Sequence, residues 1–216
     1  MNLRFVSAIV LVSCAIAPAA RAQDPPPPLP LFAVDLHGNF ARLPVNDPEL
    51  IASRGLNTGE LPPRGFGGDA AVHVYPFHYR AVTFGIGGQF SYTRGHIAPP
   101  DEIINPFQRP VTERFVTGGA QVSFNFGSGD GWSYLSGGIG RTVWQIMPDG
   151  AEPLPQDEEQ LKTINYGGGS RWFMKKHLAF SFDVRFYAVN PGSPTAEFPG
   201  SPRTTLMVIG AGVSLK

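Results

Sequence analysis

The chain has 216 residues, with 17 Lys and Arg against 17 Asp and Glu, and charged residues make up 16% of it. Gly and Pro number 26 and 22, and they disfavour helix interiors by about 1 and about 3 kcal/mol, so a helical protein is excluded. The balanced charge, without a basic stripe, argues against a nucleic-acid partner. The single cysteine, Cys14, excludes a disulfide framework within the chain.

The N-terminal residues have the pattern of a secretory signal peptide. Met1–Arg4 is positively charged, Phe5–Ala17 is almost wholly apolar, and Ala20–Ala22 offers small side chains where a signal peptidase reads. The apolar run is shorter than the roughly 20 residues that a helix needs to span a bilayer. We therefore expect residues 1–22 to be removed. The alternative is a lipobox at Leu11–Cys14, which would leave a lipidated cysteine at the mature N-terminus.

A proline-rich lead-in follows at residues 23–30. Pro25–Pro28 and Pro30 favour a stiff polyproline-II segment. We expect it to be a spacer before the first strand, with docking of a periplasmic proline-reading partner as the alternative. Residues 31–216 then have a length that suits one domain.

Eight segments between residues 32 and 215 alternate apolar and polar residues, which is the pattern of strands with two different faces. In chain order, the apolar faces are Phe32, Val34, Leu36 and Phe40; Ala70, Val72 and Val74; Val82, Phe84, Ile86, Phe90 and Tyr92; Val116, Ala120, Val122, Phe124 and Phe126; Leu135, Ile139 and Val143; a glycine-diluted sixth segment; Leu178, Phe180, Phe182, Val184 and Phe186; and Met207, Ile209, Ala211, Val213 and Leu215. The pattern is weaker in 132–146, 162–173 and 204–215. Ten strands are the alternative count, if a long connection contains a hairpin.

The connections between these segments alternate between long and short. The long ones are 43–66, 95–112, 147–161 and 189–203, and the short ones are 76–80, 127–131 and 174–177. Bacterial outer-membrane barrels have short periplasmic turns and longer loops on the cell surface. The sequence therefore predicts an all-β protein: an eight-stranded antiparallel up-and-down transmembrane β-barrel with short periplasmic turns and long extracellular loops.

Aromatic residues flank the predicted short turns and support this orientation. They are Phe77 and Tyr79, Phe126 and Trp132, and Trp172 and Phe173. Such residues form girdles at the rims of membrane barrels, so we expect these six at the bilayer interface. The alternative is a secreted, lipocalin-like barrel with the apolar face turned inward.

The sixth and seventh segments resemble a known family. Tyr166–Phe173, Leu178–Phe180 and Asp183–Tyr187 resemble the outer-membrane protein β-barrel domain family, which includes OmpA/OmpX-type and opacity-type eight-stranded barrels. The glycine-rich Tyr134–Gly140 looks like the same family's fifth strand. The resemblance covers most of 31–216 and implies architecture more than activity. We also expect a monomer in the outer membrane of a Gram-negative bacterium, in contact with outer-membrane lipids and inserted by the barrel assembly machinery. Members usually end on an aromatic residue, whereas this chain ends at Lys216.

Histidines and carboxylates on the polar faces are the candidates for chemistry. His37 and His73 are predicted to face the lumen near Asp35 and Asp69, but no His-x-Ser motif accompanies them. We expect polar packing there, and we assign no catalytic residue, no cofactor-binding residue and no metal ligand. An internal ion-pair network is expected to plug the narrow lumen, formed by Asp35, Asp69, Asp183, Arg171 and Arg185.

Other polar and flexible segments receive structural interpretations. Asp157–Glu159 is expected to be a solvated acidic loop, since its spacing matches no calcium motif. The glycine runs at 137–140 and 167–169 lack a following Lys-Ser/Thr and a helix, so they are not phosphate loops. We expect them to make room on the inner wall for large neighbours such as Tyr187 or Arg171.

The expected function is non-enzymatic. It is an envelope-structural role, or surface adhesion and contact with an unknown ligand through the four long loops. Their apolar residues, expected to pack the loops together, include Leu50, Ile51, Ile103, Ile104 and Phe107. The alternatives are a narrow channel or a conduit for small hydrophobic molecules, and a lipid-modifying enzyme.

Overall fold

A computed structural model describes residues 31–79, 82–98, 109–127 and 131–216. The predictions for the signal peptide, the proline-rich lead-in, Ile103, Ile104 and Phe107 lie outside these residues. No helix of the described part is long and apolar enough to cross a membrane.

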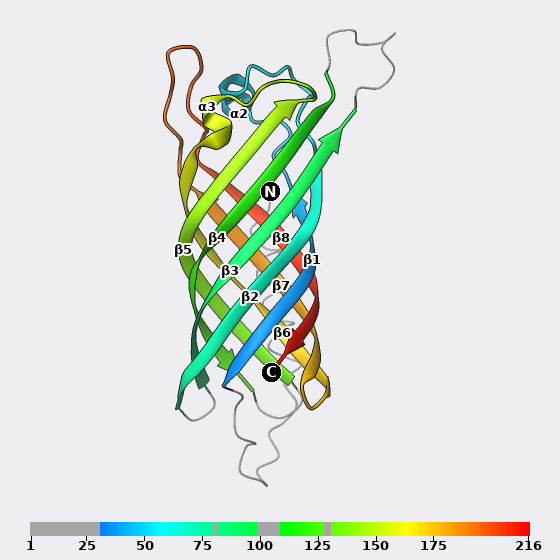
Figure 1. Cartoon of the computed structure of the whole chain (residues 1–216), viewed down its shortest axis with the longest axis vertical. Coiled ribbons are helices and arrows are strands. Elements are labelled where there is room, and N and C mark those ends of the chain that lie inside the picture. Colours follow the sequence, from blue (N-terminus) through cyan, green and yellow to red (C-terminus); the bar gives the residue numbers. More distant parts are fainter. Residues whose placement is uncertain (1–30, 80–81, 99–108, 128–130) are drawn as a thin grey trace, which may run out of the picture.

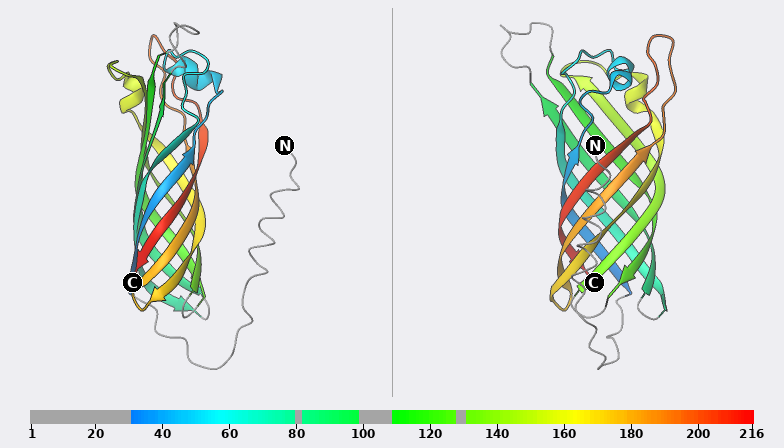
Figure 2. Two further views of the ribbon diagram at one scale, coloured as in Figure 1. Left: turned by 90° about the vertical axis from the view of Figure 1, so that its right-hand side faces the viewer. Right: turned by 180° about the vertical axis from the view of Figure 1, so that it is seen from behind.

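The described chain forms a closed barrel of eight antiparallel strands in sequence order, with β1 pairing β8 (Figures 1 and 2). The strands are β1 (Phe32–Arg42), β2 (Arg64–Tyr79), β3 (Val82–Ile97), β4 (Val111–Phe126), β5 (Gly131–Pro148), β6 (Gln160–Lys175), β7 (Leu178–Val189) and β8 (Thr204–Leu215). Two short helices, α2 (Pro48–Ser53) and α3 (Pro155–Glu158), lie in the long loops. The predicted fold class is thereby confirmed, and eight is the number of strands in the described chain.

The long and short connections lie at opposite ends of the barrel, as predicted (Figure 1). Because β2 to β6 each run for 16 or 18 residues, the loops are shorter than the sequence suggested. The four long connections between strands are 43–63, 98–110, 149–159 and 190–203, of which 99–108 lie outside the described residues. In the first, Asp47 caps α2 by accepting hydrogen bonds from the backbone N–H of Glu49 and Leu50 at 3.0 and 3.1 Å.

The outer wall carries the apolar faces that the alternation predicted. Ile139 is 71% exposed and Leu135 is 59% exposed, while the next inward residue along β5, Ser136, is buried. We call this exposed apolar surface, which runs around the barrel from the short turns to the level of Phe40 and Tyr92, the apolar belt. Polar side chains occupy most inward positions behind it, and a small aromatic cluster fills the short-turn end.

The two faces exchange character in the loop-side part of the strands. On β4, for example, Arg114 is exposed on the outer wall, whereas its neighbour Phe115 is 1% exposed and points inward. The interior at this level is a cluster of buried apolar residues. From the strands it contains Ala41, Val111, Phe115, Trp144, Ile146, Leu161, Tyr187, Val189, Leu206 and Val208, and from the first loop Leu43, Leu50, Leu56 and Leu61. The loop-side third is therefore built like a water-soluble barrel, with its apolar side chains inside.

Two of the six predicted rim aromatics face the other way. Phe77, Tyr79, Phe126 and Trp172 are exposed as expected. Trp132 is only 4% exposed, and it packs with Phe173, Tyr75 and Ala33 inside the short-turn end of the barrel. The prediction for Trp132 and Phe173 was wrong because adjacency to a turn does not fix the face. In register, Trp132 lies opposite Arg171, and both point inward.

The inner-wall glycines allow close contacts with neighbouring strands, and at Gly169 with a large side chain other than the two that the sequence suggested. A Cβ at Gly138 would collide with the backbone oxygen of Ala120 on β4, and one at Gly167 would collide with backbone of β7. A Cβ at Gly169 would also come within 2.8 Å of the Tyr134 hydroxyl. Glycine is required because neighbouring strands approach closely on the inside of a narrow barrel.

Candidate functional site

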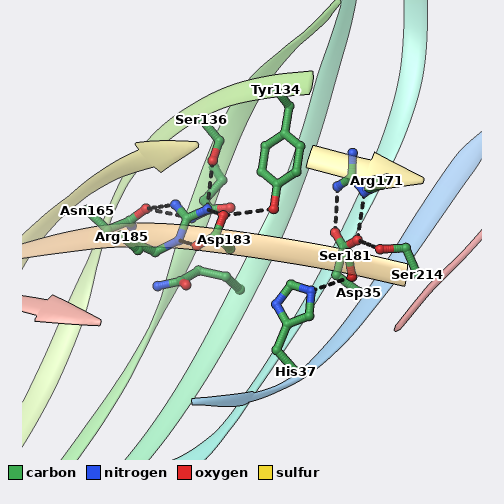
Figure 3. A network of polar contacts seen from close by, with 12 residues as sticks. Asp35, His37, Tyr134, Ser136, Asn165, Arg171, Ser181, Asp183, Arg185 and Ser214 are labelled. Carbon is green, nitrogen blue, oxygen red and sulfur yellow. Dashed lines mark hydrogen bonds and ion pairs between the residues drawn. The ribbon is translucent and has the colours of Figure 1, made fainter. Parts of the chain in front are cut away.

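The interior of the barrel is the candidate site, and its centre is a polar layer between the two apolar ends. Figure 3 shows the polar contacts of this layer. Arg171 of β6 makes a two-pronged ion pair with Asp35 of β1, through Nε at 2.7 Å and Nη2 at 2.6 Å. Its Nη1 donates to Asn125 Oδ1 at 3.0 Å, and Ser214 donates a further hydrogen bond to Asp35. The guanidinium also lies 4.1 Å above the Tyr134 ring. These contacts satisfy two charges that are almost fully buried.

A second network surrounds Arg185 on β7 (Figure 3). Its Nη2 pairs with Asp183 Oδ2 at 3.0 Å and donates to Ser136 Oγ at 2.8 Å, while Nη1 donates to Asn165 Oδ1 at 3.2 Å. Tyr134 donates to the same Asp183 carboxylate at 2.8 Å. The predicted internal ion-pair network is thus present, with one correction. Asp69 accepts a hydrogen bond from Asn39 at 2.7 Å and makes no ion pair within the described chain, because both arginines are already engaged elsewhere.

The two candidate histidines do face the lumen. His37 Nε2 lies 2.7 Å from Ser181 Oγ, so a serine and a histidine are in contact although the sequence shows no motif for it. Asp69 and His37 Nδ1 both border the space where a Cβ of Gly210 would lie, but no carboxylate of the described chain hydrogen-bonds to His37. Ser181 is fully buried, and the cavity that His37 lines, about 20 Å³, holds about one water molecule. The contact therefore has neither an orienting acid nor room for a lipid substrate.

His73 lines the same small cavity and is 2% exposed. The described residues hold no group of three or more His, Cys, Asp or Glu side chains arranged to bind a metal ion.

Above the polar layer, loop residues cover the apolar cluster at the loop-side end. We define this cap as α2, α3 and the loop residues that Arg54 joins. Arg54 Nε pairs with Asp157 Oδ1 at 2.8 Å, and both side chains are buried. The other donors of Arg54 reach Ser53 Oγ at 3.1 Å and, each at 3.0 Å, Trp144 O, Gln156 O and Ser201 Oγ. One arginine thus connects the first, third and fourth long loops.

The cap corrects one sequence interpretation and confirms another. Asp157 is not a solvated residue, since it also accepts hydrogen bonds from the backbone N–H of Ile146 at 2.9 Å and of Leu154 at 3.0 Å. The apolar loop residue Leu50 packs inward as expected and is completely buried, with Ile51 against the same cluster. The loop sequences therefore close the barrel with a folded structure.

Two carboxyl groups of this end have displaced pKa values. Burial raises the pKa of Glu113 to about 8, against the opposing hydrogen bond from Trp144 Nε1 at 2.8 Å and the charge of Arg54. Burial acts in the same direction on Glu60, but hydrogen bonds from Arg109 and Asn57 outweigh it and hold the pKa of Glu60 at about 2. Glu113 is therefore neutral, and Glu60 charged, at pH 7.

These features define a small eight-stranded up-and-down barrel with an apolar outer wall, a polar, ion-paired lumen and a folded cap. No protein-family model and no curated protein match the sequence. Among solved structures, Neisserial surface protein A has a TM-score of 0.54 at 12% identity, over 86% of this chain and 96% of its own. The predicted resemblance to small outer-membrane barrels is confirmed as one of fold.

Two further structures match with lower scores. The attachment invasion locus protein of Yersinia pestis has a TM-score of 0.47 at 12% identity, over 85% of this chain and 96% of its own. The outer membrane protein AlkL, solved in DMPC bilayers, has a TM-score of 0.40 at 13% identity, over 91% and 96%.

The buried pair between Arg171 and Asp35 is testable by a double-mutant cycle. We expect Arg171→Met to lower the free energy of unfolding by about 3–5 kcal/mol, because it leaves a buried carboxylate without its partner. The double variant Arg171→Met/Asp35→Asn should lose less than the two single changes together. Urea unfolding followed by tryptophan fluorescence measures all four proteins. Strict additivity would contradict a coupled pair.

The raised pKa of Glu113 predicts that its contribution to the free energy of unfolding falls as the pH rises. The folded state binds the proton more tightly than the unfolded state, so the stabilisation is complete below pH 4.5 and is lost as pH rises to about 8. We expect Glu113→Gln, which stays neutral, to be the more stable protein at pH 9 by up to about 4–5 kcal/mol and similar at pH 4.5. Urea midpoints across this range measure the difference. An equal difference at both pH values would contradict a buried neutral carboxyl group.

Proposed function

We propose that this chain is a non-enzymatic, monomeric barrel of the Gram-negative outer membrane, with a closed lumen and a folded extracellular cap that makes contacts outside the cell. Export by residues 1–22 and insertion by the barrel assembly machinery are part of the proposal. The observation that carries it is the exchange of faces along the strands: apolar outside and polar inside at the level of the two arginine networks, and the reverse near the loops.

The apolar belt supports the membrane placement. Large side chains such as Phe66, Val72 and Ile139 are at least half exposed around the whole wall, whereas soluble monomers rarely expose contiguous apolar patches beyond a few hundred Å². A barrel that closes all its backbone hydrogen bonds can stand in lipid with such a surface. A lipocalin-like barrel would need this apolar face inside, where the chain instead places Arg171 and Arg185.

The filled lumen favours a surface role over transport. The two arginine networks occupy its centre, and the apolar cluster with the cap closes the loop-side end. An eight-stranded barrel is just wide enough for its own side chains, and the polar cavity in this one is about 20 Å³. The part of the protein that is left to contact molecules outside the cell is the cap. Its fixed shape suits recognition because little conformational entropy is lost on binding.

Cells that lack the protein test this role when they are complemented with matched cap variants. Arg54→Gln removes the charge that joins three loops, while Arg203→Gln removes an exposed arginine of the fourth loop that belongs to no ion pair of the described chain. We expect deletion and Arg54→Gln to reduce adhesion or envelope integrity, with Arg203→Gln close to wild type. Uptake of small hydrophilic and hydrophobic solutes should not change, and the purified barrel should show no discrete conductance in planar bilayers.

Opposite outcomes identify the alternatives. Unchanged adhesion and envelope integrity with altered solute uptake would replace the proposal by a channel or conduit. A change in lipid composition on deletion would point to a lipid-modifying enzyme.

A further inference from the structure

Basic side chains form a row on the outer wall, at the loop-side border of the apolar belt. We define the basic row as Arg42, Arg64, Arg94, Arg114, Arg141 and Lys162, one residue from each of β1 to β6. All six are exposed. Two positions nearer the short turns, the same outer face continues with Phe40, Phe66, Tyr92, Val116, Ile139 and Ile164. Charge thus begins where the apolar surface ends.

The strand register places these residues in directly opposed pairs. Arg42 lies opposite Arg64, Arg94 opposite Arg114, and Arg141 opposite Lys162. Like charges directly opposite on one face destabilise a sheet. Within the described chain, the ion pairs with Asp or Glu involve other residues, and none belongs to the basic row. The register therefore repeats an unfavourable like-charge pair three times at one level of the outer wall. An anion bound next to these residues would offset the repulsion between their charges.

A groove on the wall lies between two of these pairs, with one arginine of each pair at its border, and offers room for an anion. Arg64, Phe66, Arg94, Gly95 and His96 line an open hollow of about 550 Å³ over β2 and β3. Phe66 is 61% exposed and gives it an apolar border toward the belt, while the two arginines give it a cationic border toward the loops. His96 is turned toward Asp149, 3.9 Å away, so the arginines are the charges available to a ligand.

We propose that the basic row binds the phosphate groups of anionic lipid headgroups in the outer leaflet, with their acyl chains along the apolar belt. This rests on the proposed membrane placement. The planar guanidinium donates paired hydrogen bonds to phosphate oxygens, which suits five arginines among six residues. Headgroup phosphates also lie at the depth where an apolar surface gives way to charge. The row stops at β6, so β7 and β8 form a side without this preference.

Lipid selectivity in vesicles tests the inference with the complete mature barrel. The probes are chain-labelled spin analogues of phosphatidic acid and phosphatidylcholine, and the readout is the motionally restricted fraction of each at the barrel surface. We expect wild type to prefer phosphatidic acid, and Arg94→Gln to lower that preference by up to about fivefold, with a larger loss in Arg64→Gln/Arg94→Gln. Arg203→Gln is the matched control, since it removes one exposed charge outside the row and should keep the preference.

The urea midpoint of unfolding gives a second readout, because Arg94→Gln should change it differently in the two lipids. In phosphatidylcholine alone, Arg94→Gln should raise the urea midpoint because it relieves the repulsion from Arg114. In vesicles containing phosphatidic acid, wild type should gain stability and the variant should lose its advantage. Equal preference and equal midpoints in all proteins would overturn the inference. Full stabilisation by inorganic phosphate in phosphatidylcholine vesicles would overturn the assignment to lipid headgroups.

Failure of the underlying membrane proposal looks different. A barrel that does not enter vesicles, and shows no heat-dependent change of mobility in electrophoresis, refutes the placement itself. A barrel that inserts but does not distinguish the two lipids refutes the role of the basic row alone.

Discussion

A β-strand has two faces, and the closed ladder from β1 to β8 obliges each residue to take the inside or the outside. The rest of this structure follows from how the chain uses that choice. Near the short turns it places Phe180 outside and Asp183 inside, and near the loops it places Arg114 outside and Phe115 inside. One strand can therefore contact lipid along one part of its length and water along another. The position of the exchange along the strand sets the boundary between the two.

The interior is arranged by the same constraint. Polar inward residues behind the apolar belt must satisfy one another, which Arg171 and Arg185 do through paired carboxylates and amides. Inward apolar residues near the loops need a covering, and the first loop supplies it with Leu50. The cap is needed because the strands continue beyond the belt and bring apolar side chains inside. Arg54 joins the loops of the cap through its hydrogen bonds. A filled lumen and a rigid outer end arise together.

The alternation in sequence was sufficient to predict the strands, the two ends and the apolar outer face of the belt, because a period of two is a local property. The exchange of faces near the loops was not predicted. The inward orientation of Phe173 and Trp132 was not predicted, because their position beside a turn was given more weight than the alternation of faces along the strand. The pair of Arg54 and Asp157 could not be predicted, because 103 positions separate the partners and no local pattern connects them. Arg94, by contrast, shares the face of Tyr92, so parity alone could have revealed the basic row.

Depth measurement on β4 tests the exchange of faces most directly. Spin labels on Val122→Cys and Arg114→Cys, in the barrel without residues 1–22 and hence without Cys14, report collisions with lipid-soluble oxygen and with a water-soluble nickel chelate. Collisions with oxygen should dominate at position 122, and collisions with the chelate should dominate at position 114. Chelate access at both positions would contradict a membrane barrel, and oxygen dominance at both would contradict a boundary at the exchange of faces.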